Sequence, residues 1–171
     1  MGWHLFVLHA TGPAATTATL AGAGYTPTDL RMTVDEAVAD IDQLTPDGLA
    51  VVDRDGPGLQ AVARFFDHDE LLLALSRDGG EVAAFLWQRF TGSHVLSVCR
   101  DGRPFRRLVR ADGEIVVDEG PALPIEEGVD WADGDDALLA VAATLVGEPV
   151  GAEPWVSRTA VLHRRRRRHW A

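Results

Sequence analysis

The stretch EVAAFLWQRFTGSHVLSVCRDGRPFRRLVRADGEIVVDE, residues 81–119, decides the fold of this chain. It contains four segments rich in β-branched and aromatic residues, with the two-residue period that is typical of half-buried strands. TGS, RDGR and ADGE join these segments, and Asp-Gly between two such segments is a strong signal for a tight hairpin. The stretch therefore predicts a four-stranded antiparallel meander over about residues 81–118.

Helical patterns occur on both sides of the meander. Thr33 and Glu36 have the spacing of a capping box and predict a helix over residues 34–44. DHDELLLALS predicts a second helix, and GDDALLAVAATLVG predicts a third that is capped by Asp135 or Asp136 and ends at Gly147. This order predicts an α+β fold, an antiparallel sheet with helices on one face.

Three more segments have strand-like patterns. GWHLFVLHA and LAVVDR predict strands, and TAVLH near the C-terminal arginines predicts an edge strand. LQAVARFF fits a strand or a helix, because short apolar runs do not distinguish the two by periodicity.

The composition predicts one folded domain in the cytoplasm. The 171 residues are 46% hydrophobic and 25% charged, which is ordinary for a globular protein. No apolar run has the length of a membrane span, the first residues lack a basic leader, and the single Cys99 excludes an intrachain disulfide. We expect a domain over residues 1–163 and a flexible arginine-rich tail over residues 164–171.

The segments around the meander resemble uncharacterised α+β domains of actinobacteria. The resemblance covers roughly residues 68–147 and lies in LLLALSRDGGEVAAFLWQRF, in the meander with its Leu-Pro acidic loop, and in ALLAVAATLVG. These motifs belong to turns and to the core. The resemblance therefore implies a fold and no activity.

Acidic residues are concentrated directly after the arginine-rich strand of the meander. Residues 111–136 hold ten acids, and no basic residue occurs from 111 through 157. The five arginines of RDGRPFRRLVR precede them, so opposite charges face each other across one predicted hairpin. These charges either solvate and align the sheet or offer an acidic surface to a basic protein partner. The candidate partner-binding residues are Asp118, Glu119, Glu126, Glu127, Asp130, Trp131 and Asp133.

The sequence contains no converging set of catalytic or metal-binding residues. DWADGDD departs from the calcium-loop pattern, and no His or Cys pair has the spacing of zinc ligands. Nucleophile-elbow and phosphate-loop patterns are also lacking. We therefore predict no catalytic residue, metal or cofactor. The alternative is a hydrolase or nuclease that holds a divalent ion with Asp118, Glu119, Glu126 and Glu127.

The tail could bind nucleic acid through phosphate contacts and aromatic stacking. It consists of Arg164, Arg165, Arg166, Arg167 and Arg168, followed by Trp170. Residues 1–163, however, carry 11 arginines against 26 acids, a formal charge of −15 that repels a polyanion. Disorder without a partner is a further alternative. We favour contact between the tail and the protein's own acidic surface, within one chain or in a homo-oligomer.

These patterns lead to one functional hypothesis. We expect a non-catalytic, immunity-like or regulatory module that binds a protein partner through its acidic face, and we expect neither nucleic-acid nor membrane binding. Complementary charge would select that partner and speed the encounter.

Overall fold

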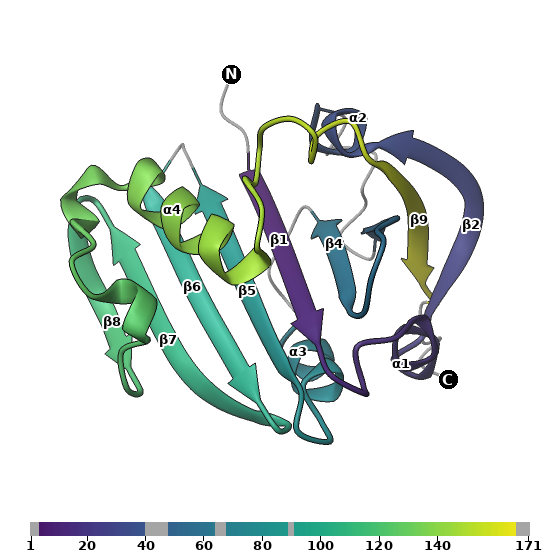
Figure 1. Ribbon diagram of the computed structural model, residues 1–171, viewed down its shortest axis with the longest axis horizontal. Coiled ribbons are helices and arrows are strands. Elements are labelled where there is room, and N and C mark those ends of the chain that lie inside the picture. The colour runs from purple at the N-terminus through teal and green to yellow at the C-terminus, as the bar shows by residue number, and fades with distance from the viewer. Residues whose placement is uncertain (1–3, 40–47, 64–67, 89–90, 167–171) are drawn as a thin grey trace, which may run out of the picture.

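A computed structural model of the chain describes residues 4–39, 48–63, 68–88 and 91–166. These residues form one nine-stranded antiparallel sheet with the strand order β2-β9-β3-β4-β1-β5-β6-β7-β8 (Figure 1). The strands are β1 (His4–Thr11), β2 (Tyr25–Thr33), β3 (Gly48–Val52), β4 (Leu59–Ala63), β5 (Glu81–Gln88), β6 (Ser93–Arg100), β7 (Arg103–Ala111), β8 (Glu114–Glu119) and β9 (Thr159–Arg165). The helices are α1 (Thr17–Gly22), α2 (Val34–Ala39), α3 (Asp69–Leu75), α4 (Asp135–Val146) and the short 3₁₀ helices η1 (Pro124–Glu126) and η2 (Trp131–Asp133).

The predicted meander is confirmed as β5 to β8. Its strands pair in sequence, β5 with β6, β6 with β7 and β7 with β8, all antiparallel. The two Asp-Gly turns between β6, β7 and β8 have positive φ at both residues: Asp101 and Gly102 at 49° and 71°, Asp112 and Gly113 at 51° and 85°. Positive φ at both central residues matches the right-handed twist of the flanking strands, which explains the Asp-Gly signal.

The prediction of an edge strand near the C-terminal arginines is wrong in its position. β9 lies between β2 and β3, and pairs with both. Its apolar residues Ala160 and Leu162 are buried, which an interior strand allows. β2 and β8 form the edges of the sheet instead. The ambiguous segment LQAVARFF forms strand β4 in its first half, and its last residues lie outside the described part of the chain.

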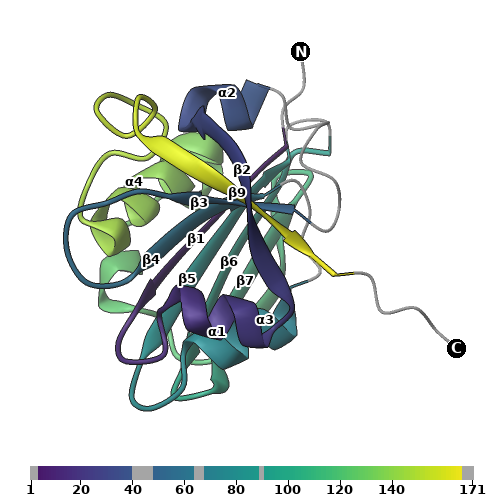
Figure 2. The ribbon, with the colours of Figure 1, turned by 90° about the vertical axis from the view of Figure 1, so that its right-hand side faces the viewer.

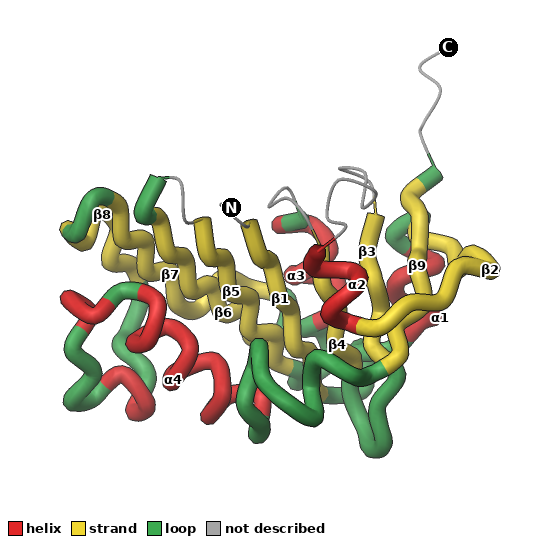
Figure 3. The backbone as a smooth tube through the Cα atoms, turned by 90° about the horizontal axis from the view of Figure 1, so that it is seen from above, coloured by secondary structure: helices red, strands yellow, loops and turns green. Residues whose placement is uncertain are grey.

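The expectation that helices pack on only one face of the sheet also differs from the structure. Side chains that alternate along β1 enter two separate cores, Leu5 and Val7 on one face, Phe6 and Leu8 on the other. Residues of α2 and α4 belong to the first core, and residues of α1 and α3 belong to the second. Figures 2 and 3 show the sheet between these helices. The central strands are buried on both faces, so two layers of helices are needed to cover them.

The helix ends follow the predicted signals in part. Thr33 and Glu36 form the expected capping box at the start of α2, with N···O distances of 2.7 and 3.1 Å, while residues 40–44 lie outside the described residues. Gly147 ends α4 in the left-handed conformation as predicted. The first turn of α4 is not capped by a side chain, because Asp135 contacts His94 instead. No described helix has the length and apolar character needed to cross a membrane.

A buried polar network crosses the first core near the end of β1. His9 is 7% exposed, and its Nδ1 lies 3.1 Å from Arg54 Nη1 and 3.3 Å from Gln60 Nε2. Burial and, secondarily, the charge of Arg54 lower the pKa of His9 from 6.5 to about 4. At neutral pH the ring is therefore uncharged, and Nδ1 accepts hydrogen bonds from its two neighbours.

This histidine should make the fold sensitive to acid. When the pH falls below 6.5 the unfolded chain binds a proton first, because the folded ring protonates only near pH 4. The free energy of unfolding should therefore fall by about 2 kcal/mol between about pH 7 and about pH 4.5 through this group alone. A His9→Gln variant should lack that component in urea unfolding at the two pH values. Identical pH dependence of parent and variant would contradict the assignment.

Candidate functional site

The chain segment after β8 builds the candidate site. Residues 120–134 leave the edge strand, return across the face of β7 and β8 through η1 and η2, and lead into α4 (Figure 3). The return begins at Gly120, which has a φ of 78°. A Cβ atom there would lie 2.0 Å from the carbonyl oxygen of Phe105, so the close approach to β7 requires glycine.

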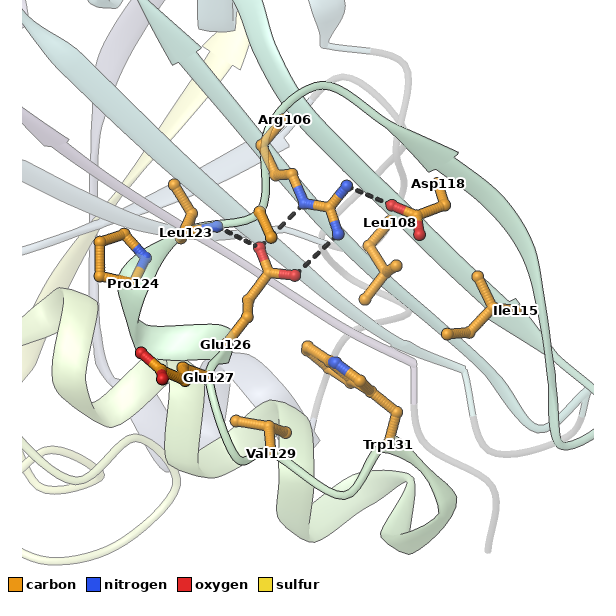
Figure 4. Close-up of a pocket in the computed structure, with 11 residues that line it drawn as sticks. Arg106, Leu108, Ile115, Asp118, Leu123, Pro124, Glu126, Glu127, Val129 and Trp131 are labelled. Carbon is orange, nitrogen blue, oxygen red and sulfur yellow. Dashed lines mark hydrogen bonds and ion pairs between the residues drawn. The ribbon is translucent and has the colours of Figure 1, made fainter.

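Arg106 on β7 fastens this segment to the sheet. Its Nε and Nη2 donate to the two carboxylate oxygens of Glu126 at 2.8 and 2.7 Å. Its Nη1 donates to Asp118 on β8, and to the carbonyl oxygens of Glu119 and Gly120 at 3.2 Å each. Glu126 also accepts a hydrogen bond from the amide of Leu123 at 3.0 Å. One guanidinium group therefore joins β7, β8 and η1 (Figure 4).

Arg106 and Glu126 form an ion pair although both side chains are buried. The side chains of Arg106 and Glu126 are only 3% and 5% exposed, whereas that of Asp118 is 61% exposed. The hydrogen bonds to Glu126, opposed by burial and aided by Asp118, raise the pKa of Arg106 further above its ordinary value. Two parallel N–H···O bonds to one carboxylate are the strongest geometry for such a pair. Arg106 is thus a structural cation, and each of its nitrogens already has an acceptor.

Two further contacts hold the later part of the segment. Arg110, four residues after Arg106 and on the same face of β7, donates to the carbonyl oxygen of Ala132 at 3.1 Å. His94 on β6 contacts Asp135 at the start of α4, with 2.5 Å between Nε2 and Oδ1. The returning segment is therefore tied to three successive strands of the meander.

An open depression of about 610 Å³ lies between the sheet and this segment (Figure 4). Its apolar lining includes Leu108 and Ile115 from the sheet, and Val129 and Trp131 from the segment. Ile115 is 47% exposed, so the depression has apolar surface open to a ligand. The side chains that line the depression are aliphatic, aromatic or acidic, apart from the paired Arg106.

The predicted partner-binding residues separate into three groups around this depression. Asp118, Glu126, Glu127 and Trp131 line it, although Glu126 is buried against Arg106 and has no free surface for a partner. Asp130 and Asp133 are exposed at the two ends of η2, beside Trp131. Glu119 is not part of the depression, because alternation along β8 places it on the other face, in register with Arg107.

The four carboxylates of the metal-dependent alternative do not converge. Arg106 already occupies the space between Asp118 and Glu126. The side chain of Glu127 points away from that pair in Figure 4, and Glu119 belongs to the opposite face. Within the described ranges, no group of three or more His, Cys, Asp or Glu residues is arranged to hold a metal ion. The positive charge that balances Asp118 and Glu126 is therefore that of Arg106.

The predicted tail begins inside the sheet. Arg164 and Arg165 are the last residues of β9, in register with Thr26 and Tyr25 of β2. Arg166 follows, with its amide donating to the carbonyl oxygen of Gly24 at 3.0 Å. The expected boundary at residue 164 is therefore two or three residues too early. Arg167, Arg168 and Trp170 lie outside the described residues.

The sequence did not single out Arg106 and Arg110, the two arginines that hold the segment beside the depression. Arg106 and Arg110 alternate with the apolar Leu108 on one face of β7, so both arginines point toward the side that receives α4. An arginine at an inward position next to a leucine signals a buried ion pair, and the acids of residues 118–127 were its available partners.

Comparison with known proteins adds no assignment to this geometry. Family models, curated proteins and solved structures were compared with the chain, and none of them matches it. The resemblance to actinobacterial domains therefore stays a prediction.

Removal of the Glu126 carboxylate should destabilise the fold strongly. A Glu126→Ala change leaves the Arg106 charge buried beside the single remaining carboxylate of Asp118, so the free energy of unfolding should fall by about 3 kcal/mol or more. Its neighbour Glu127 is exposed, and Glu127→Ala should cost less than about 0.5 kcal/mol. Urea unfolding of the two variants measures this difference.

A double variant separates burial of charge from loss of packing. Arg106→Met with Glu126→Leu removes both charges. It should recover most of the unfolding free energy lost in Glu126→Ala, because apolar side chains of similar volume can replace a buried ion pair. Equal losses for Glu126→Ala and Glu127→Ala would show that the pair does not hold the segment.

Proposed function

We propose that this protein is a non-catalytic binding module, and that the depression beside β8 holds a basic, partly apolar segment of a partner protein. An immunity-like or regulatory role is the kind of function that such a module serves. The observation that carries the proposal is an apolar depression whose exposed charges are all negative.

The charges around the depression favour a basic ligand. Asp118 and Glu127 line the depression, and Asp130 and Asp133 are exposed next to it. The cation Arg106 is paired with Glu126 and Asp118, so it offers little attraction to an anionic ligand. Arginine or lysine side chains of a ligand would meet carboxylates, and charge complementarity of this kind speeds association and selects the partner.

The apolar lining provides a place for a large side chain. Trp131 from the returning segment and Ile115 and Leu108 from the sheet line the depression together (Figure 4). A buried aromatic or aliphatic anchor surrounded by charged contacts is the common arrangement of residues that dominate binding energy. A ligand with both arginine and apolar residues therefore fits this surface better than a purely ionic one.

Titration calorimetry with a short synthetic peptide of alternating arginine and leucine tests the proposal. We expect binding with a Kd on the order of micromolar that weakens as salt is added. A peptide with serine in place of leucine should bind more weakly, and one with glutamate in place of arginine should not bind.

A pair of charge reversals assigns the binding to the depression. Glu127→Arg with Asp133→Arg should weaken binding at least about tenfold. Both side chains are exposed, and neither makes a side-chain contact needed for the segment. Asp29→Arg with Asp55→Arg changes the net charge equally on other parts of the surface and serves as the matched control. Equal weakening by both pairs, or no binding of the arginine–leucine peptide to the parent, would overturn the proposal.

A further inference from the structure

The basic and acidic surfaces of this protein lie at opposite ends of its sheet. β9 is second in the strand order and carries the exposed Arg164 and Arg165, with the exposed Arg166 directly after it. β8 is last in the order and carries the depression. Figures 1 and 3 show β9 and β8 on opposite sides of the molecule.

This separation excludes contact between the arginine segment and the depression of the same chain. Six strands lie between β9 and β8. At about 4.8 Å per strand pair the two are about 34 Å apart across the sheet. Residues 166–170, fully extended, span at most about 17 Å from the end of β9. The segment can meet an acidic depression of this kind only on another copy.

The segment has the composition that the depression selects. Arg166, Arg167 and Arg168 would face exposed carboxylates such as Glu127 and Asp133. Trp170 supplies an aromatic side chain of the kind that serves as an anchor between Ile115 and Trp131. The stretch 111–157 without any basic residue means that no cation from the loop or from α4 competes with these arginines.

We infer that residues 166–170 of one copy occupy the acidic depression of a second copy. The inference rests on the proposed function, because it names the partner of the same site. The two contacting surfaces differ, so a single contact leaves one segment and one depression free. A reciprocal second contact closes a two-fold dimer, and repetition of the single contact gives rings or open chains. Any other basic partner would then compete with this self-association.

Sedimentation velocity of the full chain over a range of concentrations tests the inference. At about 0.05 M salt the average mass should rise above that of one chain as concentration increases, and at about 0.5 M salt it should return toward one chain, because the charges are then screened. Trp170→Ala should weaken the association at least about tenfold. A full chain that stays a single copy at low salt would overturn the inference.

A charge swap identifies the two surfaces. One variant reverses the depression, Glu127→Arg with Asp133→Arg, and another reverses the segment, Arg166→Glu with Arg167→Glu and Arg168→Glu. Each variant alone should stay a single copy, because its segment and its depression then carry like charge. A mixture of the two should associate, because the native segment of the first variant matches the native depression of the second, and the two reversed surfaces also match. The Asp29→Arg, Asp55→Arg control should associate like the parent. Association of the segment-reversed variant by itself would contradict the assignment.

Failure of this inference can be distinguished from failure of the proposed function. If the arginine–leucine peptide binds the depression while the full chain stays a single copy, the site is correct and its occupant is not this segment. If the peptide fails to bind and the charge swap fails to restore association, the proposed function is overturned together with the inference.

Discussion

The buried contact of Arg106 with Glu126 and Asp118 is the interaction on which the candidate site depends. It lies at the end of the sheet where β8 has a neighbour on one side only, and where a segment that contains acids and no basic residue packs against the sheet. The guanidinium group of Arg106 pairs with two of the carboxylates, and Glu127, Asp130 and Asp133 stay exposed at the surface. Charge pairing thus divides the acidic segment into a structural part and an exposed part.

The same division is the basis of the proposal that the protein is a binding module. Glu126 is buried against Arg106 and cannot reach a ligand, whereas Asp118 is largely exposed despite its contact with Arg106, and Glu127, Asp130 and Asp133 are exposed. The apolar side chains beneath them stay accessible because the returning segment is held by hydrogen bonds at Arg106 and Arg110, and does not fill the space over Ile115. Under the proposal, such a site binds its partner through shape and charge.

The sequence predicted local structure better than long-range arrangement. The meander, the Asp-Gly turns and the capping box at Thr33 follow from short-range rules, and all three are present. The interior position of β9 depends on pairing between residues about 130 positions apart, which no local pattern encodes. The acidic segment was recognised as a candidate site, but the role of Glu126 was not, because no local pattern shows which of Arg106, Arg107 and Arg110 is buried against the returning segment.

Site-resolved hydrogen exchange in an Arg106→Met variant is the most direct test of this account. The amides of Glu126, Val129 and Asp133 form hydrogen bonds within the returning segment, and report on its opening. They should exchange at least about tenfold faster in the variant than in the parent, after correction for the change in global stability measured at the central strands β1 and β5. Acceleration of the same size in the segment and in the central strands would contradict the claim that Arg106 holds the segment in place.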